Sequence, residues 1–358
     1  MKKIKVLEIV PNMQQGGLEN LIMNIIRNLN KEKYDIHFLY HYTKNYYFDN
    51  EIIKLGCSIH KCSFREDNNI FKYNKFLKKF FMENKFDVVH SHMLSTSRFT
   101  LKYAKKNGCK ILINHSHNSQ TEKSLKGLIK RMMILGASKY ANVLLACSIE
   151  AGKFAYGHKK FKVIENGIDL KKFLFSNEIR KKIRKELKID DNDVVFGNIG
   201  RLNVQKNQLF LIDCFSKNKN KNSKLLIIGS GELKEKILFK INELKISDKV
   251  IMLENVKSEL YYSAMDCFVL TSLFEGFPLT TVEAQANCCP CAFSNKITEN
   301  VKFNDNIKFL NIEKEEWISF FNNFNMKRVE KYSPKLLYYD LSKLKNIIEK
   351  IYSGGSAQ

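Results

Sequence analysis

The stretch that decides the fold is Thr271-Ser272-Leu273-Phe274-Glu275-Gly276-Phe277-Pro278-Leu279-Thr280-Thr281-Val282-Glu283-Ala284-Gln285-Ala286. It follows the apolar run Cys267–Leu270, which predicts a buried strand. Gly276 and Pro278 end the strand and predict a helix that begins just after the proline. The stretch therefore predicts a strand, a loop and a helix, which is the repeating unit of a doubly wound α/β domain.

Two carboxylates belong to this stretch, Glu275 in the loop and Glu283 on the helix. The N–H groups of the first helical turn, from Leu279 to Thr281, have no partner within the helix and favour an anion. Carboxylates accept hydrogen bonds from hydroxyl groups. The combination favours a phosphorylated, polyhydroxylated ligand such as a nucleotide sugar.

The composition fits a globular protein of two domains. The chain has 358 residues, of which 44% are hydrophobic. Its net charge of +23 indicates an anionic partner: a phosphorylated substrate, an anionic membrane or a nucleic acid. No apolar run reaches the roughly 18 residues of a membrane span, and Ile4–Val10 is too short for a signal peptide. We therefore expect a cytoplasmic protein.

The cysteine pattern predicts free thiols. Nine cysteines, an odd number, lie mostly in apolar segments, as expected for a reduced protein. The cluster Cys288-Cys289-Pro290-Cys291 has no second ligand pair at zinc spacing, so we expect no metal there. The tail at 353–358 resembles a linker and is excluded from the fold.

Strands and helices alternate along the first half of the chain. Strands are expected at 4–10, 34–40, 57–60, 87–90, 110–114, 142–147 and 162–164, and helices near 49–55, 71–84, 94–107, 124–139 and 148–155. The alternation predicts a parallel sheet covered on both faces, with ligands at the carboxyl ends of its strands. Gly16 and Gly17 follow the first strand and let a phosphate or sugar approach the backbone.

Two pairs of histidines follow neighbouring strands, His90 with His92 and His115 with His117. Alternate residues of an extended chain face the same side, so each pair converges. Four imidazoles can chelate a metal, but no carboxylate or thiol accompanies them in the sequence. We therefore expect them to line a cleft.

Two basic segments, 71–81 and 123–135, combine lysines with apolar bulk. Such helices can lie on anionic lipid, although an ordinary surface helix gives the same pattern. For the first segment the membrane-facing candidates are Lys72, Lys75, Lys78 and Lys79.

The second half repeats the alternation, with strands expected at 194–199, 225–228 and 250–253, a short helix at 256–264 and a last helix at 334–352. Gly200 and Arg201 follow the first of these strands, and Lys206 comes at the next helix start. Arginine and lysine suit phosphate oxygens. The strand at 225–228 ends in a second glycine loop that contains Gly229 and Gly231.

Four motifs, in the expected order, resemble those of retaining family 4 glycosyltransferases of the GT-B fold, especially the capsular and exopolysaccharide type. They are Gly16-Gly17-x-Glu19, Asn166-Gly167-x-Asp169, Gly200-Arg201 with Lys206, and Glu275-x7-Glu283. The resemblance covers roughly residues 4–350. It departs from the family at Cys288, where a glycine is usual.

The resemblance implies a role for each site residue. Arg201 and Lys206 would hold the donor diphosphate, Glu275 the transferred sugar and Glu283 the ribose hydroxyls. His115 would contact the sugar near the reacting centre. The other implied donor-binding positions are Gly16, Gly17, Asn166, Gly200, Gly229, Gly231, Gly276, Phe277, Pro278, Leu279 and Thr280. His90, His92 and His117 are candidates for the acceptor side of the cleft.

The fold implied is α/β, with two Rossmann-like domains that face each other across a cleft. We expect an acceptor- and membrane-facing domain at 1–165, a nucleotide-sugar-binding domain at 166–333, and a C-terminal helix at 334–352 that crosses back to the first domain. The implied reaction is metal-independent, retaining transfer from a nucleotide-diphosphate sugar, in particular a UDP-sugar, without a further cofactor. The acceptor would be a lipid-linked or oligosaccharide intermediate of bacterial capsule or exopolysaccharide synthesis, at the inner face of the cell membrane.

Two other classes remain open. One is a GT-B enzyme that epimerises a nucleotide sugar at C2. The other is a non-catalytic basic protein that binds a membrane or a nucleic acid, although no nucleic-acid-binding motif is present.

Overall fold

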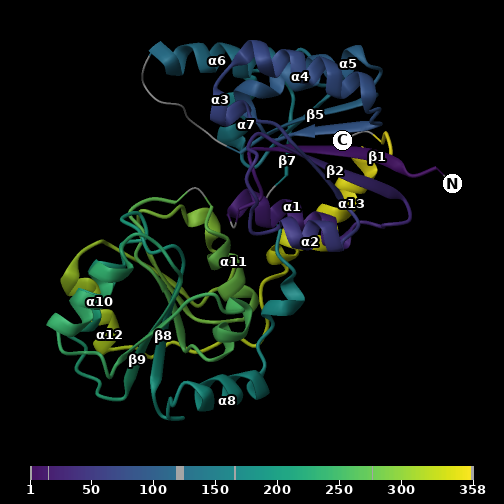
Figure 1. The fold of residues 1–358 in the computed structure, drawn as a ribbon. Coiled ribbons are helices and arrows are strands. Elements are labelled where there is room, and N and C mark those ends of the chain that lie inside the picture. The colour runs from purple at the N-terminus through teal and green to yellow at the C-terminus, as the bar shows by residue number, and fades with distance from the viewer. Residues whose placement is uncertain (1, 15, 118–124, 165–166, 276, 356–358) are drawn as a thin grey trace. The chain divides into compact units, whose positions relative to one another are not determined.

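The computed structural model describes residues 2–14, 16–117, 125–164, 167–275 and 277–355. The chain divides into two compact units (Figure 1). The first contains the residues up to Gly167 together with the segment from Leu341 onward. The second extends from Ile168 to Asp340.

Within the described residues, the first unit contains a parallel sheet of seven strands in the order β3-β2-β1-β4-β5-β6-β7. The strands are β1 Ile4–Val10, β2 Tyr34–Tyr40, β3 Ser58–Lys61, β4 Val88–Ser91, β5 Ile111–Ser116, β6 Val143–Ala146 and β7 Lys162–Val163. The helices are α1 Gly17–Asn28, α2 Asp49–Lys54, α3 Phe64–Asp67, α4 Ile70–Glu83, η1 Leu94–Thr96, α5 Ser97–Lys106, α6 Leu125–Ala137, α7 Ile149–Tyr156 and α13 Leu341–Tyr352. The predicted alternation of strands and helices is confirmed.

The central strand β1 supplies side chains to both faces of this sheet. Leu7 and Ile9 pack in one core with the buried residues of α4 and α5. Val6 and Val10 pack in the other with α1 and α13. Figure 1 shows α4 and α5 on one side of the sheet and α1 and α13 on the other. A strand buried on both faces reads as a continuous apolar run, as Ile4–Val10 does apart from Lys5 and Glu8.

The C-terminal segment differs from the single helix predicted at 334–352. It forms the 3₁₀ helix η5, Pro334–Tyr339, in the second unit and then α13 in the first. Asp340 is extended between them (φ −72°, ψ 130°), so helical hydrogen bonding stops there. The Ile168 N–H donates to the Tyr339 carbonyl (2.9 Å), which fixes η5 to the start of the second unit. Only α13 returns to the first unit.

Among the described residues of the second unit, six parallel strands follow the order β10-β9-β8-β11-β12-β13. They are β8 Val194–Ile199, β9 Ser223–Ile228, β10 Val250–Leu253, β11 Cys267–Leu270, β12 Cys291–Ser294 and β13 Ile307–Leu310. The helices are η2 Leu170–Phe173, α8 Asn177–Glu186, α9 Gln208–Phe215, α10 Lys234–Glu243, η3 Ser258–Ser263, α11 Leu279–Ala286, η4 Glu299–Val301 and α12 Lys314–Asn322. Strands β12 and β13 were not predicted, and the segment expected as a short helix at 256–264 is 3₁₀.

Cys288 occupies the turn that follows α11. Its φ of +58° lies in the left-handed region that glycine adopts without cost. A cysteine thus adopts here a backbone conformation that favours glycine. The nine cysteines are free thiols, and Cys288, Cys289 and Cys291 are buried.

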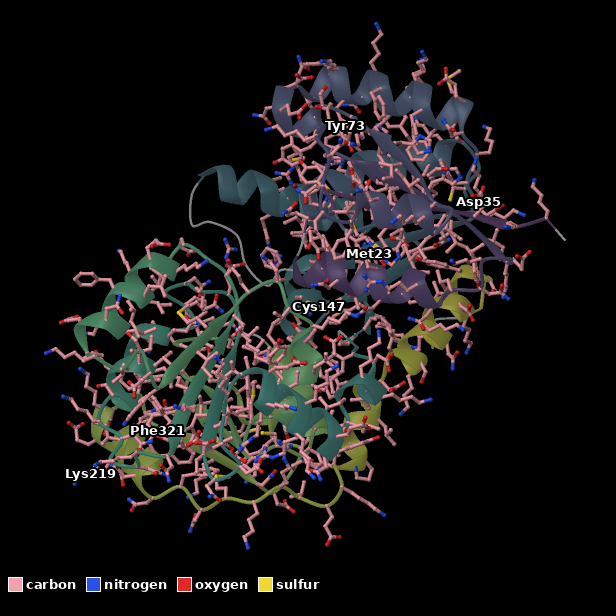
Figure 2. The ribbon with its side chains drawn as sticks, turned by 60° about the horizontal axis from the view of Figure 1, so that its bottom comes forward. Met23, Asp35, Tyr73, Cys147, Lys219 and Phe321 are labelled. Carbon is pink, nitrogen blue, oxygen red and sulfur yellow. The ribbon has the colours of Figure 1, made fainter. Side chains whose placement is uncertain are left out.

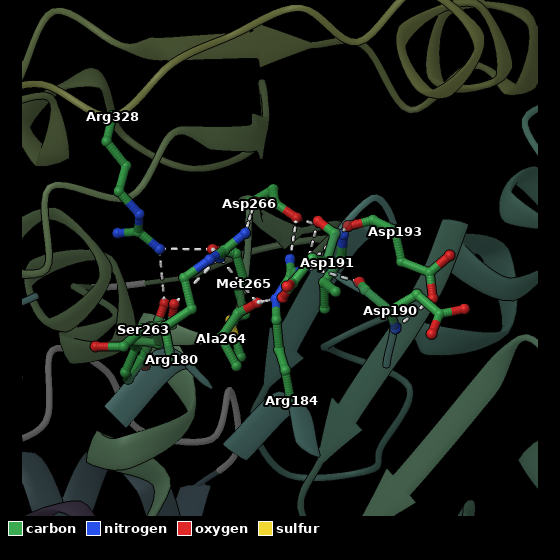
Figure 3. Close-up of polar contacts among 12 residues, drawn as sticks. Arg180, Arg184, Asp190, Asp191, Asp193, Ser263, Ala264, Met265, Asp266 and Arg328 are labelled. Atoms are coloured by element: carbon green, nitrogen blue, oxygen red, sulfur yellow. Dashed lines mark hydrogen bonds and ion pairs between the residues drawn. The ribbon is translucent and has the colours of Figure 1, made fainter. Parts of the chain in front are cut away.

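An arginine–aspartate cluster stabilises the amino end of the second sheet (Figure 3). The buried Arg184 of α8 donates to Asp266 (2.6 Å) and to the carbonyl of Ala264 (3.1 Å). Arg180 donates to the other oxygen of Asp266 (2.7 Å), and this carboxylate also accepts from the Val195 N–H. The cluster attaches α8 to the starts of β8 and β11. It lies at the opposite ends of these strands from the loops that bind ligands in this fold.

The basic helix α4 is a packed helix with a charged outer face. Tyr73, labelled in Figure 2, is buried together with Leu77, Phe80 and Phe81. Lys72, Lys75, Lys78 and Lys79 are exposed. Most of the aromatic bulk of the segment faces the core, and Phe71 remains 84% exposed. No described helix is both long and apolar enough to cross a membrane.

Candidate functional site

The donor-site residues predicted in the second unit gather at the carboxyl ends of β8, β9 and β11. These strands are neighbours in the sheet, so their following loops lie side by side. The Thr271 hydroxyl donates to the carbonyls of Lys206 (3.2 Å) and Asn207 (3.1 Å). The Leu273 N–H donates to the Gln205 carbonyl (2.8 Å). The loop after β8 is thus hydrogen-bonded to the loop after β11.

Glycines allow the loops after β8 and β9 to approach closely. A side chain at Gly229 would collide with the carbonyl of Gly200, and one at Gly231 with the carbonyl of Leu202. The Leu202 N–H donates to the Ser230 carbonyl (2.9 Å). At Gly200 itself, an added Cβ would lie 3.2 Å from Cε of Lys206. Because Gly200 has no side chain, the Lys206 side chain can pass over the backbone at this point.

Lys206 and Glu275 form an ion pair at the centre of these loops. Lys206 Nζ lies 2.6 Å from Glu275 Oε1, and the two side chains are 15% and 8% exposed. The Ser272 hydroxyl (2.7 Å) and the Gln205 amide (3.3 Å) also donate to the Glu275 carboxylate. The side chains predicted to hold a diphosphate and a sugar are therefore in direct contact.

Arg201 stands apart from this pair. Its side chain is 73% exposed and its Nε lies 3.7 Å from a carboxylate oxygen of Glu232. Such an exposed pair contributes little, so the guanidinium can turn to another anion at small cost. The buried Gln208 donates to the Arg201 carbonyl (3.0 Å) and holds the backbone in place.

At the start of α11, the Thr281 N–H donates to the Pro278 carbonyl (3.0 Å), so the expectation that it lacks a partner is wrong. Pro278 is the N-cap, and the Thr281 hydroxyl donates back to its carbonyl (2.7 Å). The Thr280 hydroxyl is buried and has no partner in the described part of the chain. Leu279 packs with the apolar residues around η5, and the ring of Phe277 stacks on Tyr339 (4.9 Å). The side chains of Phe277 and Leu279 thus support the loop by packing.

Glu283 lies on α11 next to η3. The Tyr262 hydroxyl donates to its Oε2 (2.6 Å). Burial raises the pKa of Glu283 to about 7, while the Tyr262 hydrogen bond opposes the rise. Near neutral pH this carboxyl can therefore exist with or without its proton.

The glycines of the first unit lie at the start of α1. Gly16 is its N-cap in extended conformation, and an added side chain there would collide with Glu19. Gly17 has open space around its Cα. Asn166 and Gly276, also predicted for the donor site, lie outside the described residues.

The four predicted histidines come together at the ends of β4 and β5. His90 Nε2 lies 3.2 Å from His115 Nδ1, and His92 Nδ1 lies 2.9 Å from His117 Nε2. The expectation that no carboxylate accompanies them is wrong. Glu8 of β1 pairs in register with His90, and its Oε2 lies 3.0 Å from His92 Nε2. Burial lowers the pKa of His92 to about 4 and those of His115 and His117 well below the usual range.

Sequence reasoning missed several polar residues of these sites: Glu8, Gln205, Gln208, Tyr262, Ser272 and Tyr352. Only Gln205 and Ser272 could have been suspected, because they flank recognised motifs. Glu8 is an isolated polar position in an apolar segment, Tyr352 ends an amphipathic helix without a motif, and Tyr262 reaches Glu283 from another element.

Comparison with known proteins matches both halves of the chain to one family. The profile described as Glycosyltransferase Family 4 matches residues 15–172, and that described as Glycosyl transferases group 1 matches residues 179–318. The capsular polysaccharide biosynthesis glycosyltransferase CapH of Staphylococcus aureus is 27% identical over 326 residues, which are 87% of this chain and 87% of the relative.

Two further similarities cover most of the chain. The UDP-Gal:alpha-D-GlcNAc-diphosphoundecaprenol alpha-1,3-galactosyltransferase of Escherichia coli is 28% identical over 264 residues, 69% of this chain and 67% of the relative. The crystal structure of HepE of Anabaena in complex with UDP has a TM-score of 0.78 at 16% identity, covering 99% of this chain and all of that chain. The fold is therefore GT-B. The chain belongs to the family 4 glycosyltransferases, a family of retaining enzymes that use nucleotide sugars.

Proposed function

We propose that this enzyme transfers a sugar from a UDP-sugar to a lipid-linked or oligosaccharide acceptor in capsule or exopolysaccharide synthesis. The observation that carries the proposal is the Lys206–Glu275 pair, held at the carboxyl ends of β8 and β11. It puts a cation for phosphate and an acceptor for sugar hydroxyls within one hydrogen bond of each other. In a sugar diphosphate the anionic phosphate and the sugar hydroxyls are neighbours, so such a pair can contact both.

Binding of the diphosphate rests on charge and on backbone donors. Lys206 can share its ammonium between Glu275 and a phosphate oxygen. The exposed Arg201 can replace its weak contact with Glu232 by a bidentate contact with phosphate. The first turn of α11 adds N–H groups. As the anomeric bond breaks, the leaving diphosphate gains charge, and donors already in position stabilise it without reorganisation.

The two glutamates would bind the two other parts of the donor, the transferred sugar and the ribose. Glu275, next to the cation, would accept hydrogen bonds from hydroxyls of the transferred sugar. Glu283 would accept from the ribose, with Tyr262 holding its other oxygen. In the first unit, His115 would contact the sugar near the reacting centre.

The acceptor is proposed from the relatives. The E. coli relative is named for a diphosphoundecaprenol-linked acceptor and CapH for capsular polysaccharide. A lipid-linked acceptor requires the enzyme to work at a membrane surface. The exposed lysines of α4 offer a basic face for anionic lipid, so we propose a peripheral position at the inner face of the cell membrane.

Incubation with a panel of nucleotide sugars and diphosphoundecaprenol-linked acceptors, followed by mass spectrometry, tests the proposal. We expect an acceptor longer by one sugar together with free UDP. An epimerase would release an epimer without using the acceptor. Transfer only from a GDP-sugar, or to a soluble acceptor alone, would contradict the donor and acceptor proposed here.

A further inference from the structure

Six polar side chains form a buried cluster inside the first unit, and the proposed function uses only one of them. Glu8 comes from β1, His90 and His92 from the end of β4, His115 and His117 from the end of β5, and Tyr352 from the last turn of α13. Glu8, His90, His115 and Tyr352 are each at most 2% exposed. Buried polar groups need partners, so the hydrogen-bond pattern of this cluster is constrained.

The contacts form two branches that begin at Glu8. In one, the Tyr352 hydroxyl donates to Glu8 Oε1 and lies 2.8 Å from His90 Nδ1, and His90 Nε2 lies 3.2 Å from His115 Nδ1. In the other, Glu8 Oε2 lies 3.0 Å from His92 Nε2, and His92 Nδ1 lies 2.9 Å from His117 Nε2. The ring planes of His90 and His115 are nearly parallel (5°), with centroids 5.3 Å apart.

The protons of neutral imidazoles can be placed in only one way. The Glu8 carboxylate accepts on both oxygens, from the Tyr352 hydroxyl at Oε1 and from His92 Nε2–H at Oε2. Tyr352 gives its single proton to Glu8, so its oxygen must accept from His90 Nδ1–H. A neutral His90 is then bare at Nε2 and must accept from His115 Nδ1–H. By the same reasoning, His92 donates from Nε2 to Glu8 and accepts at Nδ1 from His117 Nε2–H.

His115 consequently has its proton on Nδ1 and a lone pair on Nε2. That nitrogen is buried and has no partner in the described part of the chain. A buried acceptor without a donor is costly, and a substrate hydroxyl that reaches it would remove the cost. We propose that Glu8 is a positioning residue that holds His115 in this tautomer, so that Nε2 accepts a hydrogen bond from a hydroxyl group of the sugar substrate. This inference rests on the proposed function for the identity of the ligand.

A metal ion is the competing occupant of this cluster. One nitrogen from each of His90, His92 and His115 lies within 4.8 Å of the others. In the observed arrangement, however, both nitrogens of His90 and of His92 are already used in hydrogen bonds within the cluster. A metal would have to break these contacts. The geometry therefore favours the two hydrogen-bonded branches, which together form a relay from Glu8 to His115 and His117.

The tautomers can be read directly by ¹⁵N NMR of protein labelled at its eight histidines, because protonated and bare imidazole nitrogens have different shifts. His115→Asn identifies the His115 signals. In the wild type we expect a proton on Nδ1 of His115 and a bare Nε2. A proton on Nε2, which an additional charge on His90 would cause, overturns the proposal.

Two variants test Glu8 itself. The carboxamide of Glu8→Gln has one acceptor where the carboxylate has two, so one branch must reverse its protons and either His115 or His117 must change tautomer. Tyr352→Phe is the matched control, because His90 Nδ1–H can turn to Glu8 Oε2, 3.5 Å away, and His115 keeps its tautomer. Unchanged tautomers of both histidines in Glu8→Gln would refute the relay.

Activity and metal content complete the test. If the His115 branch reverses, Glu8→Gln should lose about tenfold in kcat/KM, as expected for about 1.4 kcal/mol of a lost hydrogen bond, and should still bind UDP. Stoichiometric zinc after dialysis against the ion, abolished by His92→Asn, would replace the relay by a metal site. A wild type that transfers no sugar would contradict the proposed function but leave the tautomer result standing.

Discussion

The two glutamates of the donor site should differ in their effect on UDP binding. In Glu275→Gln, Lys206 loses the carboxylate that neutralises it at 2.6 Å. Its ammonium is then free for the diphosphate. Because UDP lacks the transferred sugar, it loses no hydrogen bond when the carboxylate is removed. A hydrogen bond to a charged group contributes about 1.5–3 kcal/mol and a neutral one about half of that. We therefore expect the UDP affinity to stay the same or to rise, by at most about tenfold.

Glu283→Gln should instead weaken UDP binding. If Glu283 accepts from ribose hydroxyls, replacing its charge by an amide removes about 1–2 kcal/mol, a factor of roughly 5–30. Because burial raises the pKa of Glu283 to about 7, the wild type must be measured at a higher pH, where the carboxyl is ionised. At pH 6 the difference between the wild type and Glu283→Gln should shrink.

Isothermal calorimetry of UDP binding at about pH 8.5 decides the matter, since this pH is more than one unit above that pKa. Glu330→Gln is a suitable control, because it removes the same charge from an exposed position outside the donor loops. If Glu275→Gln weakens UDP as much as Glu283→Gln does, the division of the donor between the two glutamates is wrong. In that case Glu275 would serve to orient Lys206 toward the phosphates.

Three further predictions concern metal, membrane and pH. Turnover should survive excess EDTA, because Lys206 and Arg201 supply the positive charge; complete loss that one divalent ion restores would contradict this. Replacing the four α4 lysines (Lys72, Lys75, Lys78, Lys79) by glutamine should weaken sedimentation with anionic vesicles by about 1 kcal/mol per charge at low salt. The same change at four exposed lysines on α8 and just after it (Lys181, Lys182, Lys185, Lys188) should have less effect. The free energy of unfolding should fall as the pH drops from about 6.5 to 4, by about 1.4 kcal/mol per pH unit for each buried imidazole, because the unfolded chain takes up protons that native His92, His115 and His117 refuse. Glu19 and Glu283, whose pKa values are raised, act in the opposite direction. His41 and His60, whose pKa values are lowered by burial, add to the effect of the three histidines. A flat stability profile in urea titrations over this range would therefore show that the histidines are not buried as described.

The parts of the donor site that lie on one segment could be predicted from the sequence. The strand, loop and helix of 267–286 were evident from the apolar run and from the Gly276 and Pro278 breaks. The contact between Lys206 and Glu275 was not, because it depends on β8 and β11 being neighbours in the sheet. Strand order comes from packing and is not encoded in the spacing of a motif.

The errors in the second unit have local causes. Strands β12 and β13 are only four residues long, and β13 contains an exposed lysine, so neither gives a clear apolar pattern. The predicted helix at 334–352 has helix-forming residues on both sides of Asp340. Its interruption comes from the bridge between Ile168 and Asp340, a contact between distant parts of the chain.

Glu8 shows why a buried carboxylate can escape sequence reasoning. Within Ile4–Val10 it looks like a polar interruption of an apolar strand, and nothing nearby explains it. The register of β1 with β4 puts it opposite His90, and α13 adds the hydroxyl of Tyr352 from 344 positions away in the sequence. The cost of burying Glu8 is offset by donors from two other elements, the end of β4 and α13. A chain that ended before Tyr352 would leave Glu8 with one donor fewer and His90 without its nearest acceptor, so α13 contributes to the chemistry of this cluster as well as to the core of the first unit.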